Sequence, residues 1–160
     1  MILLSAALIA SAEPSTLKAE HFGRTAWIFS TVGHSEFCPP GNVTLDVRTG
    51  RYTFTPRASR RVCEDVTLER PVKRGRLTGV ALAPIQTAYR RVLQEGFESQ
   101  HCQDATRAQD IRISNGGTPI LVLTTGRATA SAPDDLSCWN DAASALHDLL
   151  DTTFRSPPDP

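Results

Sequence analysis

Apolar and polar side chains alternate through the segment that runs from Val43 to Phe54. The apolar residues occupy every second position on either side of a Thr49-Gly50 pair: Val43, Leu45, Val47, Tyr52 and Phe54. A period of two places these side chains on one face of a strand pair. If Thr49-Gly50 is a two-residue loop, Val47 faces Tyr52 and Leu45 faces Phe54. The pattern therefore predicts an antiparallel hairpin with one buried face.

Other segments have the composition of strands. Residues 25–32, TAWIFSTV, are rich in β-branched and aromatic side chains and lie between two glycines. In residues 120–123, ILVL, the apolar side chains point to both faces of a sheet, which is typical of a central strand. The remaining turn signals predict a short edge strand at 65–70, an Asn115-Gly116 hairpin that follows Ile111 and Ile113, and a return strand at 128–130.

Three- and four-residue spacing of apolar side chains predicts a first helix. Pro84 suits its opening turn, and Gly96 is placed as a left-handed stop. This helix has about 12 residues. Its apolar stripe comprises Ile85, Tyr89, Val92 and Leu93.

The last element is a second amphipathic helix. Its apolar stripe runs from Trp139 to Phe154, and Ser137 is the expected N-cap. The order of elements is strands, helix, strands, helix, with tight turns that require antiparallel pairing. We therefore expect an α+β fold, in which a twisted antiparallel sheet carries both helices on one face.

The first twelve residues are apolar and uncharged, and they end in the small-x-small sequence Ala10-Ser11-Ala12. This pattern predicts a signal peptide at 1–12, a linker at 13–23, a single domain at 24–155 and a disordered tail at 156–160. The alternative is that residues 1–12 form the first strand or helix of the domain. No apolar run is long enough to span a bilayer. The prediction is a periplasmic or secreted protein without a transmembrane segment after cleavage.

Four cysteines are spread along the chain: Cys38, Cys63, Cys102 and Cys138. Behind a leader, an even number of cysteines predicts two disulfides. Pairing Cys38 with Cys63 and Cys102 with Cys138 would bracket each half of the chain, although three connectivities are possible. A structural zinc site is the lesser alternative, because no close C-x₂₋₄-C pair is present.

The formal net charge is zero, but the charges are segregated. Residues 47–91 hold eleven Lys and Arg against three acids, and residues 92–160 hold four against ten. Clustered arginines bind carboxylates and phosphates, so the basic block predicts a face for an anionic partner. The alternative is a solvated surface that the acidic final helix compensates. The candidate basic face comprises Arg57, Arg60, Arg61, Arg70, Lys73, Arg74 and Arg76.

The sequence contains no motif of a catalytic nucleophile, a metalloprotease or a nucleotide-binding loop. His34 with Glu36 is the best acid/base pair, and such short-range pairs are mostly surface features. His101 adjoins Cys102, but neighbours on an extended chain point apart. His147 lies at the margin of the apolar stripe and is interpreted as a boundary residue of the core. We predict no catalytic residue, no metal ligand and no cofactor.

The layout resembles small exported bacterial domains of unknown function. The resemblance covers residues 24 to 154 and is carried by the Cys38-Pro39 turn, the hairpin, the Asn115-Gly116-Gly117 turn and a closing helix that contains residues 146–150, LHDLL. It implies an α+β fold and an exported location, and it transfers no activity.

The leading hypothesis is therefore a non-enzymatic binding or inhibitory module. Its expected partner is an anionic envelope component or a protein, and not nucleic acid, since the net charge is zero. The alternative is a small envelope hydrolase or a thiol-redox protein whose site the spacing of residues does not reveal.

Overall fold

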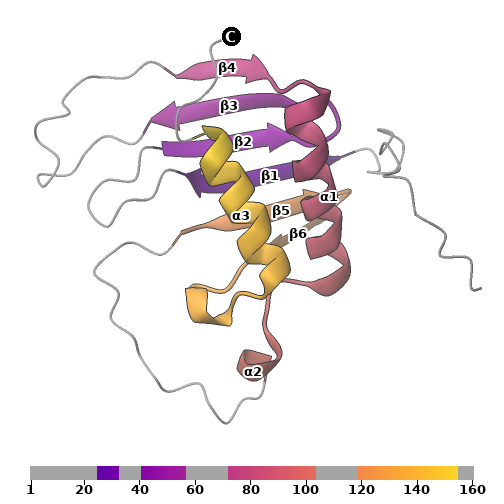
Figure 1. Cartoon of the computed structure of the whole chain (residues 1–160), viewed down its shortest axis with the longest axis vertical. Helices are drawn as coiled ribbons and strands as arrows, with labels where there is room; N and C mark the ends of the chain where they lie inside the picture. Colours follow the sequence, from indigo (N-terminus) through magenta and orange to yellow (C-terminus); the bar gives the residue numbers. More distant parts are fainter. Residues whose placement is uncertain (1–24, 33–40, 57–71, 104–118, 155–160) are drawn as a thin grey trace, which may run out of the picture.

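The computed structural model of the protein describes residues 25–32, 41–56, 72–103 and 119–154. These residues form one six-stranded sheet, in which every pair of neighbours is antiparallel, together with two long helices packed on it and two short ones (Figure 1). In chain order the elements are β1 (Ala26–Val32), β2 (Gly41–Asp46), β3 (Arg51–Pro56), β4 (Lys73–Arg76), α1 (Gly79–Glu95), α2 (Gln100–Gln103), β5 (Leu121–Thr125), β6 (Ala128–Ser131), the 3-10 helix η3 (Leu136–Cys138) and α3 (Asp141–Phe154).

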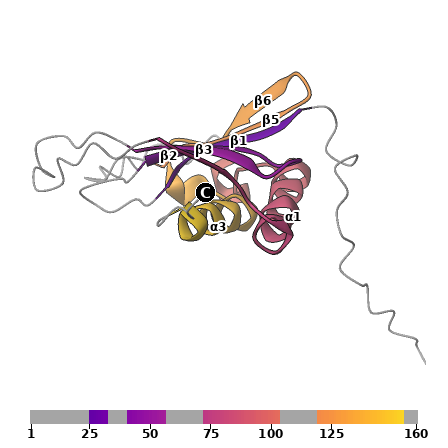
Figure 2. The same ribbon diagram turned by 90° about the horizontal axis from the view of Figure 1, so that it is seen from above.

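The strand order across the sheet is β4-β3-β2-β1-β5-β6, so β1 lies at the centre and β4 and β6 are the edges. Figure 2 shows α1 and α3 side by side on one face of the sheet. The α+β class and the placement of both long helices on one face are confirmed. The predicted edge strand at 65–70, the Asn115-Gly116 hairpin, residues 1–12 and 13–23, and the tail at 156–160 lie outside the described residues.

The helices bury one face of the sheet in a continuous core. From the sheet the core takes alternate side chains of β1, β2, β3 and β5, and from the helices it takes one stripe of each. Its large members that are almost fully buried include Ile28, Leu45, Tyr89, Leu121, Leu123, Leu146, Leu150 and Phe154. In β5, only the helix-facing side chains are buried, whereas Ile120 on the other side is 41% exposed. The prediction of a strand inside the sheet is confirmed, because β5 lies between β1 and β6, although no described element covers its second face.

The β2–β3 hairpin has the predicted faces but a different register. Leu45 pairs with Tyr52 and Val43 with Phe54, two residues away from the predicted pairing. The loop is longer because the Asp46 carboxylate accepts hydrogen bonds from the Arg48 N–H and the Thr49 hydroxyl, and Gly50 donates its N–H to the Asp46 carbonyl at 2.8 Å. Since the shift is two residues, every side chain keeps its face.

Helix α1 begins earlier than predicted. Its first residue is Gly79, so Pro84 lies inside the helix. The additional turn buries Leu82, whose N–H donates to the Thr78 carbonyl. Burial of this apolar side chain outweighs the loss of the one backbone donor that proline lacks. Gly96 ends the helix as predicted, with a φ of 78°, although its ψ of −166° is not left-handed helical.

The start of the last helix also differs from the prediction. Trp139 precedes α3 and pairs with Glu98 in an isolated β-bridge. Ser137 belongs to η3 instead, where the Asp135 side chain caps it. Asn140 caps α3, because its side-chain oxygen accepts from the Ala143 N–H at 2.9 Å.

The edge strand β4 has no apolar alternation, and the sequence analysis did not predict it. Gly75 pairs with Tyr52 on β3. A Cβ atom on Gly75 would lie 2.6 Å from the Tyr52 hydroxyl oxygen. The ring of Tyr52 also packs edge-to-face against Phe154 of α3, with centroids 5.0 Å apart. Gly75 thus gives Tyr52 the space to join β4, β3 and α3.

We expect Gly75→Ala to lower the free energy of unfolding by about 1–3 kcal/mol, because the new methyl group displaces a packed ring. The matched control is Gly79→Ala, since a Cβ atom there has no neighbour within 4 Å. That control should change stability by no more than about 1 kcal/mol. Urea unfolding measures both variants, and equal midpoints would contradict the packing role of Gly75.

Stability should also fall in alkali through Tyr89. Its hydroxyl donates to the Thr124 carbonyl at 2.9 Å, and burial raises its pKa above the ordinary 10.0. Because the folded pKa exceeds the unfolded one, this contribution is complete below about pH 10 and is lost as the pH rises through the folded pKa. Tyr89→Phe should cost about 1 kcal/mol at neutral pH and flatten the alkaline loss. Urea unfolding between about pH 7 and 11 tests this, and an unchanged alkaline slope would contradict it.

Candidate functional site

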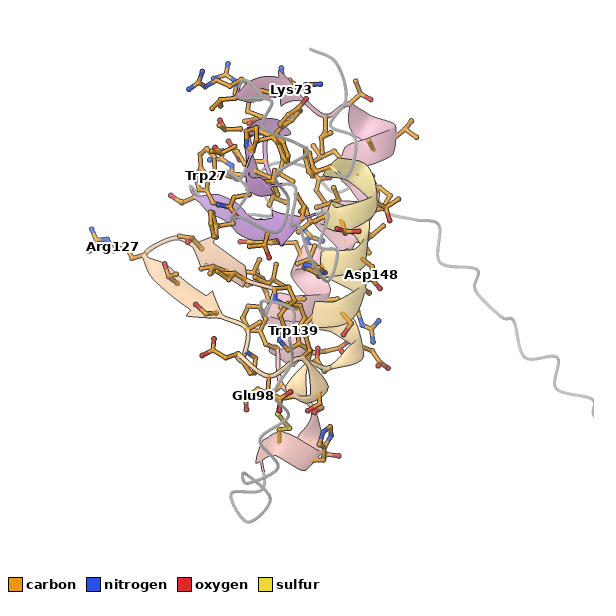
Figure 3. All side chains as sticks on the ribbon, turned by 90° about the vertical axis from the view of Figure 1, so that its left-hand side faces the viewer. Trp27, Lys73, Glu98, Arg127, Trp139 and Asp148 are labelled. Atoms are coloured by element: carbon orange, nitrogen blue, oxygen red, sulfur yellow. A yellow bond between two sulfur atoms is a disulfide. The ribbon has the colours of Figure 1, made fainter. Side chains whose placement is uncertain are left out.

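The face of the sheet opposite the helices carries no described element. We call it the open face. Its side chains are those that alternate with the core residues, among them Trp27, Phe29, Thr44, Asp46, Arg51, Thr53, Arg74, Arg76, Val122 and Thr124. Figure 3 shows Trp27 pointing away from α3 on this side of the sheet. At 39% exposed, the Trp27 ring is accessible to a ligand.

The register places three kinds of side chain in order across the open face. Starting at the β4 edge, Arg74 pairs with Thr53, Thr53 with Thr44, and Thr44 with Phe29. Three strand spacings separate the arginine from the phenylalanine, which is about 14 Å. Trp27 lies two residues from Phe29 on the same face of β1. In this row cation, hydroxyls and aromatic ring follow one another, and in the neighbouring row the carboxylate of Asp46 lies between Trp27 and the paired Arg51 and Arg76.

The cationic band consists of Arg51, Arg74 and Arg76. Arg51 pairs directly with Arg76 across β3 and β4, an arrangement of like charges that destabilises a sheet. Arg76 donates from Nε to the Thr49 carbonyl at 2.7 Å, which is a bond to a neutral acceptor. Within the part of the chain that the structure describes, none of the three makes an ion pair with a carboxylate.

The structure divides the predicted basic face. Arg74 and Arg76 lie on the open face, whereas Lys73 shares the helix-side face with Phe54. Arg57, Arg60, Arg61 and Arg70 lie outside the described residues. Arg51 was missed, although alternation places it opposite to the buried Tyr52.

The predicted compensation of the basic block by the final helix does not extend to the cationic band. Helix α3 carries Asp141, Asp148 and Asp151 and no Lys or Arg. Figure 3 shows Asp148 on the helix side, with the sheet between it and the open face. The acidic helix and the three arginines therefore lie on opposite sides of the sheet.

The described histidines have structural contacts. His147 is half-buried, and its Nε2 atom lies 3.0 Å from the Thr31 carbonyl, so Nε2 carries a proton that it donates. Its ring also packs edge-to-face with Trp139. The interpretation of His147 as a boundary residue of the core is confirmed. His101 is exposed beside the Ser99 hydroxyl, and His34 and Glu36 lie outside the described residues.

The disulfide between Cys102 and Cys138 is confirmed, with Cα atoms 5.5 Å apart. It links α2 to η3 where two backbone hydrogen bonds also cross, from Ser99 N–H to the Cys138 carbonyl and from Asn140 N–H to the Phe97 carbonyl. The pair Cys38 and Cys63 lies outside the described residues. Among the described residues no group of three His, Cys, Asp or Glu side chains is arranged to hold a metal ion.

No helix in the described ranges is both long and apolar enough to cross a membrane. Comparison with known protein families, with curated proteins and with solved structures found no match. The resemblance to exported bacterial domains stays a prediction.

Replacing both Cys102 and Cys138 by serine should lower the free energy of unfolding by about 4 kcal/mol, because the bridge closes a loop with a sequence separation of 36. Urea unfolding of the oxidised proteins measures the change. Stability equal to that of the parent protein would contradict a stabilising role of the disulfide.

Proposed function

We propose that this protein is an exported, non-enzymatic binding module whose open face binds an acidic polysaccharide. The observation that carries the proposal is the cationic band of Arg51, Arg74 and Arg76, which has no described carboxylate partner and faces the same side as Trp27 and Phe29. The apolar leader at 1–12 and the disulfide between Cys102 and Cys138 support export.

Each band of the open face suits one part of a carboxylated sugar chain. Guanidinium groups bind carboxylates through paired, charge-assisted hydrogen bonds. The hydroxyls of Thr44 and Thr53 donate to and accept from sugar hydroxyls. The C–H faces of sugar rings are apolar and pack on aromatic rings such as those of Trp27 and Phe29.

The same arrangement disfavours a nucleic-acid strand. A single strand is usually held where bases stack on aromatic rings beside a cationic groove, whereas here Thr44 and Thr53 separate Phe29 from Arg74. The three arginines also occupy one edge of the sheet rather than a track that follows a phosphate backbone. An uncharged sugar chain would leave the arginines without a function. A carboxylated polysaccharide satisfies all three bands.

Binding to polygalacturonate tests the proposal by isothermal titration calorimetry. We expect Arg51→Ala with Arg74→Ala to weaken binding by about tenfold to a hundredfold, since each lost bond involves two charged groups. Arg90→Ala with Arg91→Ala is the matched control, because it removes the same charge from α1, and it should bind like the parent. Trp27→Thr should weaken binding while preserving its salt dependence.

Uncharged dextran, a single-stranded oligonucleotide and anionic lipid vesicles serve as the comparison ligands. The parent should prefer polygalacturonate over all three, and added salt should weaken this binding. Equal losses in the two double-arginine variants would show that net charge alone drives binding and would overturn the proposal. Preference for the oligonucleotide or for vesicles would replace the polysaccharide with that ligand.

A further inference from the structure

The two edges of the sheet differ in their ability to pair with another strand. An edge strand exposes backbone donors and acceptors that can accept an additional strand. On β4, three of the four residues are Lys or Arg, so a second β4 would bring like charges face to face. Edge strand β6, Ala128–Ser131, has the sequence ATAS, contains no charge and is exposed throughout.

The hydrogen bonds of β6 define which of its groups are free. Ala132 donates its N–H to the Leu121 carbonyl of β5. The backbone N–H and C=O groups of successive residues in an antiparallel strand point alternately to opposite sides. Those of Ala128 and Ala130 therefore also point toward β5, and those of Thr129 and Ser131 point away from the sheet. The free ladder ends at Pro133, which has no N–H, and at the turn formed by Gly126 and Arg127.

We propose that β6 pairs antiparallel with β6 of a second copy of this chain. The pairing that uses all the free groups is centred on Ala130, so that Thr129 of each copy lies opposite Ser131 of the other and both backbone hydrogen bonds form in each pair. The side chains at the seam are alanine, threonine and serine, which are small enough for the strands to approach. A two-fold interface of this kind is self-complementary.

Charge complementarity supports the same register. Centring on Ala130 places Arg127 of one copy beside the chain that follows Pro133 in the other, where Asp134 is located. Arg127 and Asp134 are both exposed. Figure 3 shows Arg127 projecting from the end of the β5–β6 hairpin, away from the helices. The two-fold axis forms this cation–carboxylate contact twice. No equivalent pairing exists for β4, because its charged residues all have one sign.

Sedimentation equilibrium over a range of concentrations tests the proposal. The parent should pass from monomer to dimer in the high-micromolar range, as expected for a short seam. Ser131→Pro removes only an outward N–H and should keep the fold while weakening dimerisation by about tenfold or more. Circular dichroism and the urea midpoint report whether that variant remains folded.

A charge exchange keeps the test independent of the proline variant. Arg127→Asp should weaken dimerisation, and the further change Asp134→Arg should restore it. The matched control is Arg74→Asp at the other edge, which should dimerise like the parent. A monomeric mass for the parent at every concentration would overturn the proposal. A dimer that survives both Ser131→Pro and Arg127→Asp would place the contact elsewhere and overturn it too.

Discussion

The one-sided cover of the sheet is the constraint on which the rest of the structure depends. Helices α1 and α3 meet the same face, where Phe154 packs against Tyr52 and Tyr89 donates to the backbone of β5. Since side chains alternate along a strand, burial of one face assigns every second residue to the other. Packing against the helices places no demand on those residues. The open face is therefore where arginines, threonines and aromatic rings are compatible with the fold.

Alternation predicted the faces of the sheet correctly, but it could not define the register of the β2–β3 hairpin. The length of that loop depends on the Asp46 carboxylate, which holds the Arg48 N–H and the Thr49 hydroxyl. Such bonds are local polar chemistry that an apolar pattern does not record. The start of α1 differed because of an apolar contact in the tertiary structure. Burial of Leu82 extends the helix to Gly79, although Pro84 is a residue that favours the first turn of a helix.

The candidate site was predictable to the extent that strand parity defines it. Parity alone assigns Arg51 to the face opposite Tyr52, so the hairpin pattern already contained that residue. Separating Lys73 from Arg74 required β4, whose sequence KRGR has no strand signal of its own. That strand depends on Gly75, which leaves space for the ring of Tyr52 on the neighbouring strand. Contacts between strands, rather than preferences within β4, therefore determine which cations share a face with the aromatic rings.

The edges of the sheet connect the two proposals. A two-fold axis perpendicular to the sheet at Ala130 keeps both open faces on the same side and places the two cationic bands at the outer edges, roughly 50 Å apart over twelve strands. A long acidic polymer would then reach both bands, and the second attachment is intramolecular, so apparent affinity rises without any new contact. A short oligosaccharide would reach one band only. In this dimer the uncharged β6 strands join the two sheets, and the basic β4 strands at its outer edges stay unpaired on their outer side.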